Sequence, residues 1–138
     1  MNKDHPSVAI INSLEVTELI KDYFTILKLP VSTLDRRVLY QKDVKEGIMA
    51  FIENTSPQFV IWSIPPPYRE NWELYQEIRS SLAGKGINFI VITLLKDDLD
   101  RAVGYPTEAQ QFSGKIEELD EICRSVREKF AVQKERER

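Results

Sequence analysis

Five polar side chains lie in or just after the ends of apolar runs of this sequence, and their chemical types decide what chemistry the chain can support. They are Asn12, Ser13, Ser63, Thr93 and Lys115. A serine hydroxyl is a poor nucleophile unless a neighbouring base activates it. The single histidine, His5, lies too far along the chain from these residues to be assigned as that base. Mg²⁺ prefers anionic oxygen ligands, usually one or two carboxylates, and none of the five side chains supplies one.

The composition is that of an ordinary globular protein. The chain has 138 residues, which suits one domain, and its 42% apolar and 30% charged residues allow a full hydrophobic core. Its net charge of -3, with both signs scattered along the chain, gives no basic footprint for nucleic acid. One cysteine, Cys123, leaves no internal disulfide and fits a reducing compartment. No apolar run reaches the roughly 20 residues of a membrane helix, and residues 1–6 lack the apolar core of a signal peptide, so we expect a cytoplasmic protein without a membrane partner.

Apolar runs typical of strands alternate with amphipathic helical patterns along the chain. Strands are predicted at 7–11, 31–34, 59–63, 88–95 and 109–112, the last on the weakest pattern. Apolar residues at helical spacing predict helices at 16–27, 44–52, 72–82, 97–103 and 119–130. Asp43 followed by Glu46 predicts a capping box at the start of the second helix. The charged residues after 130 are either the solvated end of the last helix or frayed.

Five strands, each followed by a helix, predict an α/β fold with a doubly wound, five-stranded parallel sheet in flavodoxin-like order. We expect residues 1–138 to form one domain, with its core at about 7–130 and a charged tail at 131–138. The run at 88–95 is apolar on both faces, which favours a strand inside a sheet that helices cover on both sides. In such sheets the functional crevice lies beyond the carboxyl ends of the strands, where the five polar side chains are expected.

Over nearly its whole length the sequence resembles the receiver domains of bacterial two-component response regulators. Residues 56–65, Ser-Pro-Gln-Phe-Val-Ile-Trp-Ser-Ile-Pro, are similar to that family's acceptor strand, which reads Pro-Asp, an apolar run, Asp, any residue, Pro. Thr93 lies 30 residues beyond Ser63, and Lys115 lies 22 beyond Thr93, both similar to the family's intervals. Phe112 falls at the position of the family's aromatic switch residue. Pro66-Pro67-Tyr68, Asn71-Trp72 and the Gly-Lys start of residues 114–119 look like one subgroup of stand-alone receivers.

The resemblance implies a site that has lost its acidic groups. Ser63 corresponds to the family's phosphate-accepting aspartate, and Asn12 with Ser13 to its acidic pair. We therefore expect no phosphorylation, no Mg²⁺ or other cofactor, and no catalysis. In a receiver the lysine meets a carboxylate or phosphate, whereas Lys115 would face neutral groups. Because an unpaired buried lysine is costly, we expect Lys115 to find an acid, such as Glu15 or Asp97, or to turn to solvent.

The resulting hypothesis is a degenerate, stand-alone receiver-like domain that acts in phosphorelay signalling by protein–protein interaction. The resemblance implies a partner, or a second copy, at the face of the fourth helix, fifth strand and fifth helix, roughly 98–104 and the outer face of 116–130. One alternative is a small flavodoxin-like enzyme or nucleotide-binding protein, although residues 11–16 contain no glycine for a phosphate loop. Another is a working response regulator in which Glu15 or Asp97 replaces the lost acid, although neither lies at the acceptor position.

Several of these residues also have a purely structural interpretation. Ser13 suits the N-cap of the first helix, and Thr93 is a β-branched residue that favours strands. Trp62 and Trp72 are expected to pack in the core, and Cys123 to serve as a small buried hydrophobe. The prolines at 65–67 are expected to stiffen the loop after Ser63.

Overall fold

A parallel sheet forms the centre of the molecule. The computed structural model describes residues 7–11, 14–34, 38 and 41–136, with residues 14–17 described as backbone only. Within that part of the chain the strands are β1 (Val8–Ile11), β2 (Val31–Thr33), β3 (Phe59–Ser63), β4 (Asn88–Thr93) and β5 (Gln110–Gln111). The helices are α1 (Leu14–Ile26), α2 (Val44–Thr55), α3 (Tyr68–Ser81), α4 (Lys96–Val103) and α5 (Ile116–Arg136). The strand order β2-β1-β3-β4-β5, parallel at every pair, confirms the predicted doubly wound sheet.

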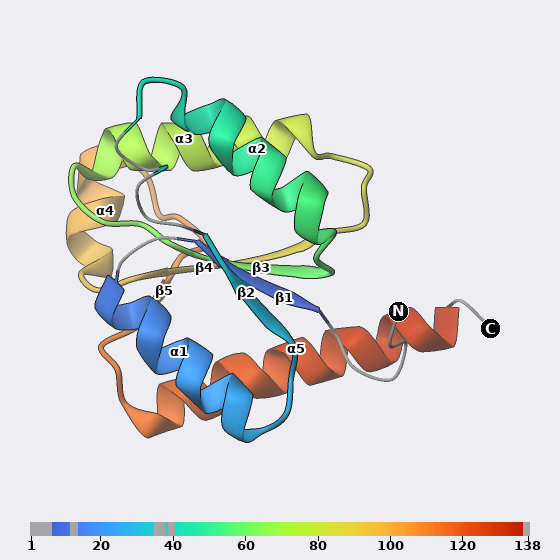
Figure 1. The fold of residues 1–138 in the computed structure, drawn as a ribbon. Coiled ribbons are helices and arrows are strands. Elements are labelled where there is room, and N and C mark those ends of the chain that lie inside the picture. The colour runs from blue at the N-terminus through green and yellow to red at the C-terminus, as the bar shows by residue number, and fades with distance from the viewer. Residues whose placement is uncertain (1–6, 12–13, 35–37, 39–40, 137–138) are drawn as a thin grey trace.

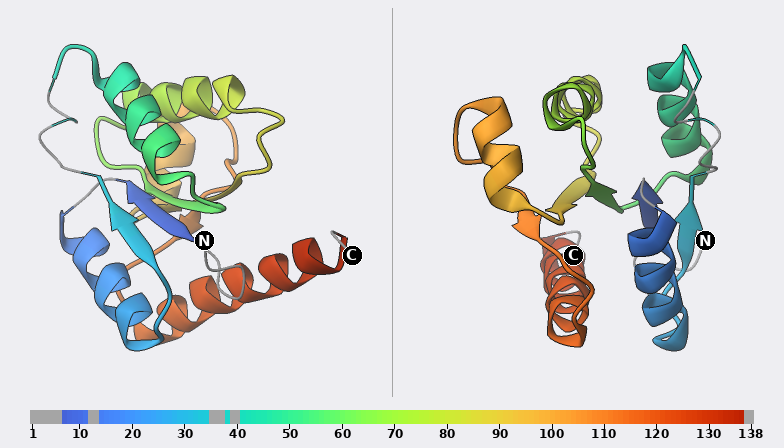
Figure 2. Two further views of the ribbon diagram at one scale, coloured as in Figure 1. Left: turned by 45° about the vertical axis from the view of Figure 1, so that its right-hand side comes forward. Right: turned by 90° about the vertical axis from the view of Figure 1, so that its left-hand side faces the viewer.

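Helices cover both faces of this sheet. α1 and α5 lie on one face, and α2, α3 and α4 lie on the other, as Figure 1 and Figure 2 show. Successive side chains of a strand point to opposite faces, so Phe59 and Ile61 of β3 pack towards α1 and α5. Val60 and Trp62 pack towards the other three helices. All of β3 is buried, which explains why its sequence is apolar without alternation.

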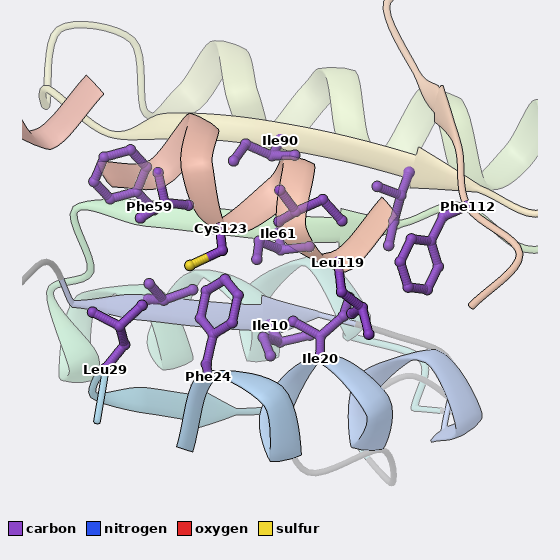
Figure 3. Close-up of a cluster of buried hydrophobic side chains, with 14 of the residues drawn as sticks. Ile10, Ile20, Phe24, Leu29, Phe59, Ile61, Ile90, Phe112, Leu119 and Cys123 are labelled. Atoms are coloured by element: carbon purple, nitrogen blue, oxygen red, sulfur yellow. The ribbon is translucent and has the colours of Figure 1, made fainter. Parts of the chain in front are cut away.

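The core on the α1 and α5 side is a cluster of aliphatic and aromatic side chains (Figure 3). Ile61 lies between Ile10 of β1 and Ile90 of β4 in the register of the sheet. Cys123 of α5 is buried in the same cluster, which confirms its predicted role as a small core residue. Phe112 is buried at the end of the cluster that lies nearest the carboxyl ends of the strands.

The core on the other face is built around aromatic rings. Tyr75 of α3 lies 5.3 Å from Trp62 and 5.2 Å from Trp72, measured between ring centroids. Such pairs add about 0.5–1.5 kcal/mol to the free energy gained by burying the rings. Both tryptophans are buried, so the prediction that they are core residues is confirmed.

The helix start predicted at Asp43 is confirmed, but the capping box predicted there is wrong. α2 begins at Val44, and the Asp43 side chain makes no capping hydrogen bond. The backbone of Asp43 has φ -99° and ψ 46°, whereas an N-cap residue usually has the extended conformation that directs its side chain at the first free N–H groups.

The last two strands are shorter than the sequence predicts. β4 ends at Thr93, so Leu94 and Leu95 lie outside the sheet and are exposed. β5 is reduced to the exposed pair Gln110–Gln111, because it is the edge strand and pairs only with β4. The apolar continuation of β4 could not reveal where the pairing stops.

The segment predicted as a charged tail continues the last helix. α5 runs to Arg136, and the Lys134 ammonium lies 5.5 Å from the centre of the Phe130 ring. Of the two alternatives for this segment, the helical end is the one observed, and it projects beyond the sheet in Figure 1. In the described parts of the chain, none of the helices combines the length and apolarity needed to cross a bilayer.

Candidate functional site

A pocket of about 310 Å³ opens at the carboxyl edge of the sheet. This is the edge at which ligand crevices of open α/β sheets lie. The pocket is bounded by the ends of β3 and β4, the segment after β5, and one side chain of α1. Its described lining consists of Leu19, Ser63, Ile64, Pro65, Pro66, Tyr68, Ile92, Thr93, Leu94, Leu95, Phe112, Ser113 and Gly114.

The structure brings together part of the predicted site. Ser63, Thr93 and Phe112 line this single pocket. Lys115 is exposed and does not line it. Asn12 and Ser13 lie outside the described residues, so their predicted contribution stays a prediction.

Thr93 is buried and its hydroxyl group has a structural hydrogen bond. Thr93 Oγ1 donates to the carbonyl oxygen of Ile64 at 2.9 Å, which ties the end of β4 to the residue after β3. The Ile64 N–H donates to the Ile92 carbonyl oxygen at 2.9 Å, and the Phe112 N–H donates to the Thr93 carbonyl oxygen at 2.8 Å. These three bonds lock the ends of β3, β4 and β5 together.

Phe112 packs inwards from the end of β5. Its side chain is 1% exposed and belongs to the core cluster of α1 and α5. Figure 3 shows it beside the end of β4, in the layer that also holds Ile20 and Leu119. The ring thus forms part of the pocket wall and part of the hydrophobic core.

Lys115 occupies the N-cap position of α5. Its backbone N–H donates to Glu118 Oε1 at 2.9 Å, and the Ser113 N–H donates to the same oxygen at 2.9 Å. Glu118 is the third residue of α5, so it supplies one half of a capping box. Lys115 is exposed, which is one of the two outcomes expected for it, the other being an acidic partner.

Glu118 is held in its ionised form by these contacts. Desolvation, the largest single influence, raises the pKa of Glu118, but the hydrogen bonds from Lys115, Ser113 and Gly114 together outweigh it and lower the pKa. The spacing of Lys115 and Glu118 was the signal for this cap. It was missed because the usual capping box begins with serine or threonine, whereas lysine can use only its backbone.

The pocket is apolar and, in its described lining, carries no charged side chain. Its side-chain hydroxyls come from Ser63, Thr93, Tyr68 and Ser113. The Ser113 hydroxyl lies 3.1 Å from Glu118 Oε1, and the Thr93 hydroxyl is bonded to Ile64. Ser63 is 6% exposed. Across the described residues, no group of three or more His, Cys, Asp or Glu side chains is placed to hold a metal ion.

Of the two acids considered as replacements, only the side chain of Asp97 is described, and it does not line the pocket. Asp97 is exposed in the first turn of α4 and does not line it. The side chain of Glu15 lies outside the described residues. The structure therefore gives no support to Asp97 as the acid of a working acceptor site.

A polar cluster that the sequence analysis missed fixes the loop before β5. Lys96 Nζ donates to Asp100 Oδ2 at 2.8 Å and to the Thr107 carbonyl oxygen at 2.9 Å. Thr107 Oγ1 donates to Asp100 Oδ1 at 2.7 Å. Desolvation raises the pKa of Asp100, but the bonds from Lys96 and Thr107 lower it further than desolvation raises it. The i,i+4 spacing of Lys96 and Asp100 was the available signal.

A second set of contacts ties the same loop to α3. The Trp72 indole N–H donates to the Tyr105 hydroxyl oxygen at 2.8 Å, and Arg79 pairs with Glu108 at 2.6 Å. Burial is the main reason that the pKa of Tyr75, beneath this ion pair, rises to about 12. The loop between α4 and β5 is thus held from both of its neighbouring helices.

Comparison with known proteins identifies the architecture. No protein-family model matches the chain, and no curated protein is significantly similar to it. Among solved structures, the chain is similar to the "response regulator receiver domain (CheY-like) from Methylobacillus flagellatus", with a TM-score of 0.60. The two share 14% sequence identity, over 88% of this chain and 98% of that one. At this identity the likeness shows the fold alone: the chain has a CheY-like, flavodoxin-like receiver fold.

Proposed function

We propose that this chain is a receiver-like signalling domain that acts by contact with other proteins in the bacterial cytoplasm and is not switched by phosphorylation. One observation carries the proposal. Ser63 ends β3, where a receiver has its acceptor aspartate, and it lines a pocket whose described walls bear no charged side chain.

The physical argument concerns charge. Phosphoryl transfer depends on positioning the phosphoryl group and neutralising its negative charge, usually with Mg²⁺ and basic groups. Mg²⁺ is held by hard, anionic oxygen ligands. The side-chain oxygen atoms of the described pocket lining belong to uncharged hydroxyl groups. Lys115, the basic group that would neutralise a phosphate, is exposed outside the pocket. We therefore propose that Mg²⁺ binding has been lost together with phosphorylation.

The surface we propose for protein contact is the face formed by α4, β5 and α5. Gln110 and Gln111 are exposed there on an edge strand, which leaves backbone groups available for pairing. Arg124 and Glu121, 2.9 Å apart, lie beside them in a shallow polar groove. The partner at this face is either a different protein or a second copy of this chain. Sedimentation across a concentration series separates the two, because only self-association raises the molecular mass with concentration, and Arg124→Glu should then reduce that rise.

Acetyl phosphate tests the proposal directly. The protein is incubated with acetyl phosphate, with and without Mg²⁺, beside a receiver that retains its acceptor aspartate, and intact masses are measured. We expect the control receiver to gain a phosphoryl group and this chain to stay unmodified. A specific, Mg²⁺-dependent adduct on this chain would overturn the proposal.

No contact of the described residues favours the alternative of a small enzyme or nucleotide-binding protein in the same crevice. A thermal-shift screen against nucleotides and flavins tests it independently, because a ligand that binds the folded state raises the unfolding temperature in a saturable way.

A further inference from the structure

The apolar surface at the carboxyl edge extends beyond the pocket itself. Leu94 and Leu95, which leave the sheet after β4, are 56% and 49% exposed, and Leu19 of α1 is 45% exposed. All three line the pocket. An apolar patch of this kind, joined to a cavity, is typical of an interaction site, because covering apolar surface removes it from water and so stabilises a complex.

The size of the cavity limits what can fill it. Its volume of about 310 Å³ corresponds to roughly ten water molecules and lies at the lower limit of pockets for drug-sized ligands, about 300–1,000 Å³. A small ligand inside it would leave the leucines at the mouth exposed. A protein segment that inserts one or two apolar side chains covers the cavity and the leucines together.

The exposed charged residues that neighbour the pocket lining along the chain indicate the chemistry of the partner. Exposed acids lie within two or three residues of pocket-lining side chains, mainly in the first turns of helices, where they also interact favourably with the helix N-termini. They are Glu18, Asp22, Glu70, Asp97, Asp98 and Glu117, which we call the acidic rim. Two exposed basic residues, Arg69 and Lys115, are also sequence neighbours of pocket-lining residues. A third basic residue, Lys96, is paired with Asp100. Asp98 has a longer contact of 3.8 Å with Arg101.

This charge distribution argues against a second copy as the occupant. A two-fold contact would place the same patch of each chain against itself, and the acidic rims would then face each other. Juxtaposed like charges disfavour a complex. A basic segment has the complementary charge.

We propose that the carboxyl-edge pocket and its leucines dock an amphipathic segment of another protein, with leucine- or phenylalanine-sized side chains on one face and lysine or arginine on the other. Its apolar face covers Leu19, Leu94 and Leu95 and inserts a side chain into the pocket beyond the ends of β3 and β4. Its basic face meets the acidic rim. The inference rests on the proposed function in that the chain acts by protein contact, but it uses a different surface from α4, β5 and α5.

Fluorescence anisotropy with a model segment tests this docking site. The probe is a labelled amphipathic peptide of leucine and lysine, about 18 residues or five helical turns long, titrated with the full-length chain. We expect saturable binding that weakens with salt, with Asp97→Asn/Asp98→Asn, and by about tenfold or more with Leu94→Gln/Leu95→Gln. Because these positions are exposed, the variants should keep the fold, which circular dichroism checks.

The matched control is Ile26→Gln, which removes a 77% exposed apolar side chain at the other end of α1. We expect it to leave peptide affinity unchanged. The docking site is overturned if the peptide does not bind, if the leucine and isoleucine variants behave alike, or if a peptide with serine in place of leucine binds equally well. Those results leave the proposed function standing, whereas a Mg²⁺-dependent phosphoryl adduct overturns the proposed function whatever the peptide does.

Discussion

At the scale of single residues, Thr93 shows how a buried hydroxyl at the end of a central strand can serve the fold. Its Oγ1 atom donates to the Ile64 carbonyl oxygen, and its own carbonyl oxygen accepts from the Phe112 N–H. Both contacts are buried. A hydroxyl engaged in this way holds together the strand ends that form the pocket floor.

Replacing Thr93 with valine should therefore destabilise the protein. The change preserves side-chain shape but leaves the Ile64 carbonyl oxygen without its side-chain donor, which costs about 1–3 kcal/mol of the free energy of unfolding. Urea denaturation measures the loss. Thr93→Ser keeps the hydroxyl and should recover most of the stability, and equal stability of the valine variant and the wild type would show that the bond contributes nothing.

Ser63 leads to a second prediction at this scale. In Ser63→Asp the new carboxylate is buried in an apolar pocket, which raises its pKa above the unfolded value of about 3.9. A raised pKa leaves stability intact below the unfolded pKa and reduces it as pH rises, so the variant should lose about 2 kcal/mol relative to wild type between pH 4 and pH 7. Ser63→Asn should show no such pH dependence. If Mg²⁺ restored the free energy of unfolding of Ser63→Asp at pH 7, the account would be contradicted, because the pocket would then hold an intact ion site.

At the scale of elements, the start of α5 explains why Lys115 lies outside the pocket. The segment after β5 is held by Glu118, whose carboxylate accepts the N–H groups of Ser113 and Lys115. That places Lys115 at the N-cap of α5 with its side chain in solvent. The same cap fixes Gly114 against Leu19, where an added Cβ would lie 3.3 Å from Leu19 Cδ1.

Removing the Glu118 carboxylate should show how much this cap contributes to the free energy of unfolding. Because the pKa of Glu118 is lowered in the folded state, its contribution is present above the unfolded pKa of about 4.3 and is lost as pH falls through the folded value. Glu118→Ala should lower the free energy of unfolding by about 1 kcal/mol at pH 7, and the difference from wild type should shrink in acid. Glu117→Ala, in the same turn and exposed, is the control. Equal effects of the two variants would refute a specific role for Glu118.

Much of the fold could be predicted because the central strands contain uninterrupted apolar runs. Phe59–Ser63 and the centre of β4 leave no alternative to a sheet covered on both sides. The end of β4 could not be predicted, since Leu94 and Leu95 extend its apolar run although they lie outside the sheet. Of the residues predicted to form the site, Ser63, Thr93 and Phe112 line the pocket and Lys115 does not. The apolar walls come from loop prolines and leucines that only tertiary structure brings together.

At the scale of the whole molecule, the chain combines a receiver fold with an apolar pocket at the edge where receivers place their acidic groups. The strand ends are locked by hydrogen bonds, the loop before β5 is held from α3 and α4, and the exposed leucines at the pocket have mainly acidic exposed neighbours along the chain. These features favour a domain that presents surfaces to partners over one whose pocket is rearranged by a phosphoryl group.

The central claim is that this pocket takes neither Mg²⁺ nor a phosphoryl group. The most direct measurement is an NMR titration of the backbone amides with beryllofluoride, a phosphoryl mimic, together with Mg²⁺. We predict that the amide resonances of Ser63, Thr93 and Phe112 do not move. Saturable shifts of these three resonances that require both Mg²⁺ and beryllofluoride would contradict the account.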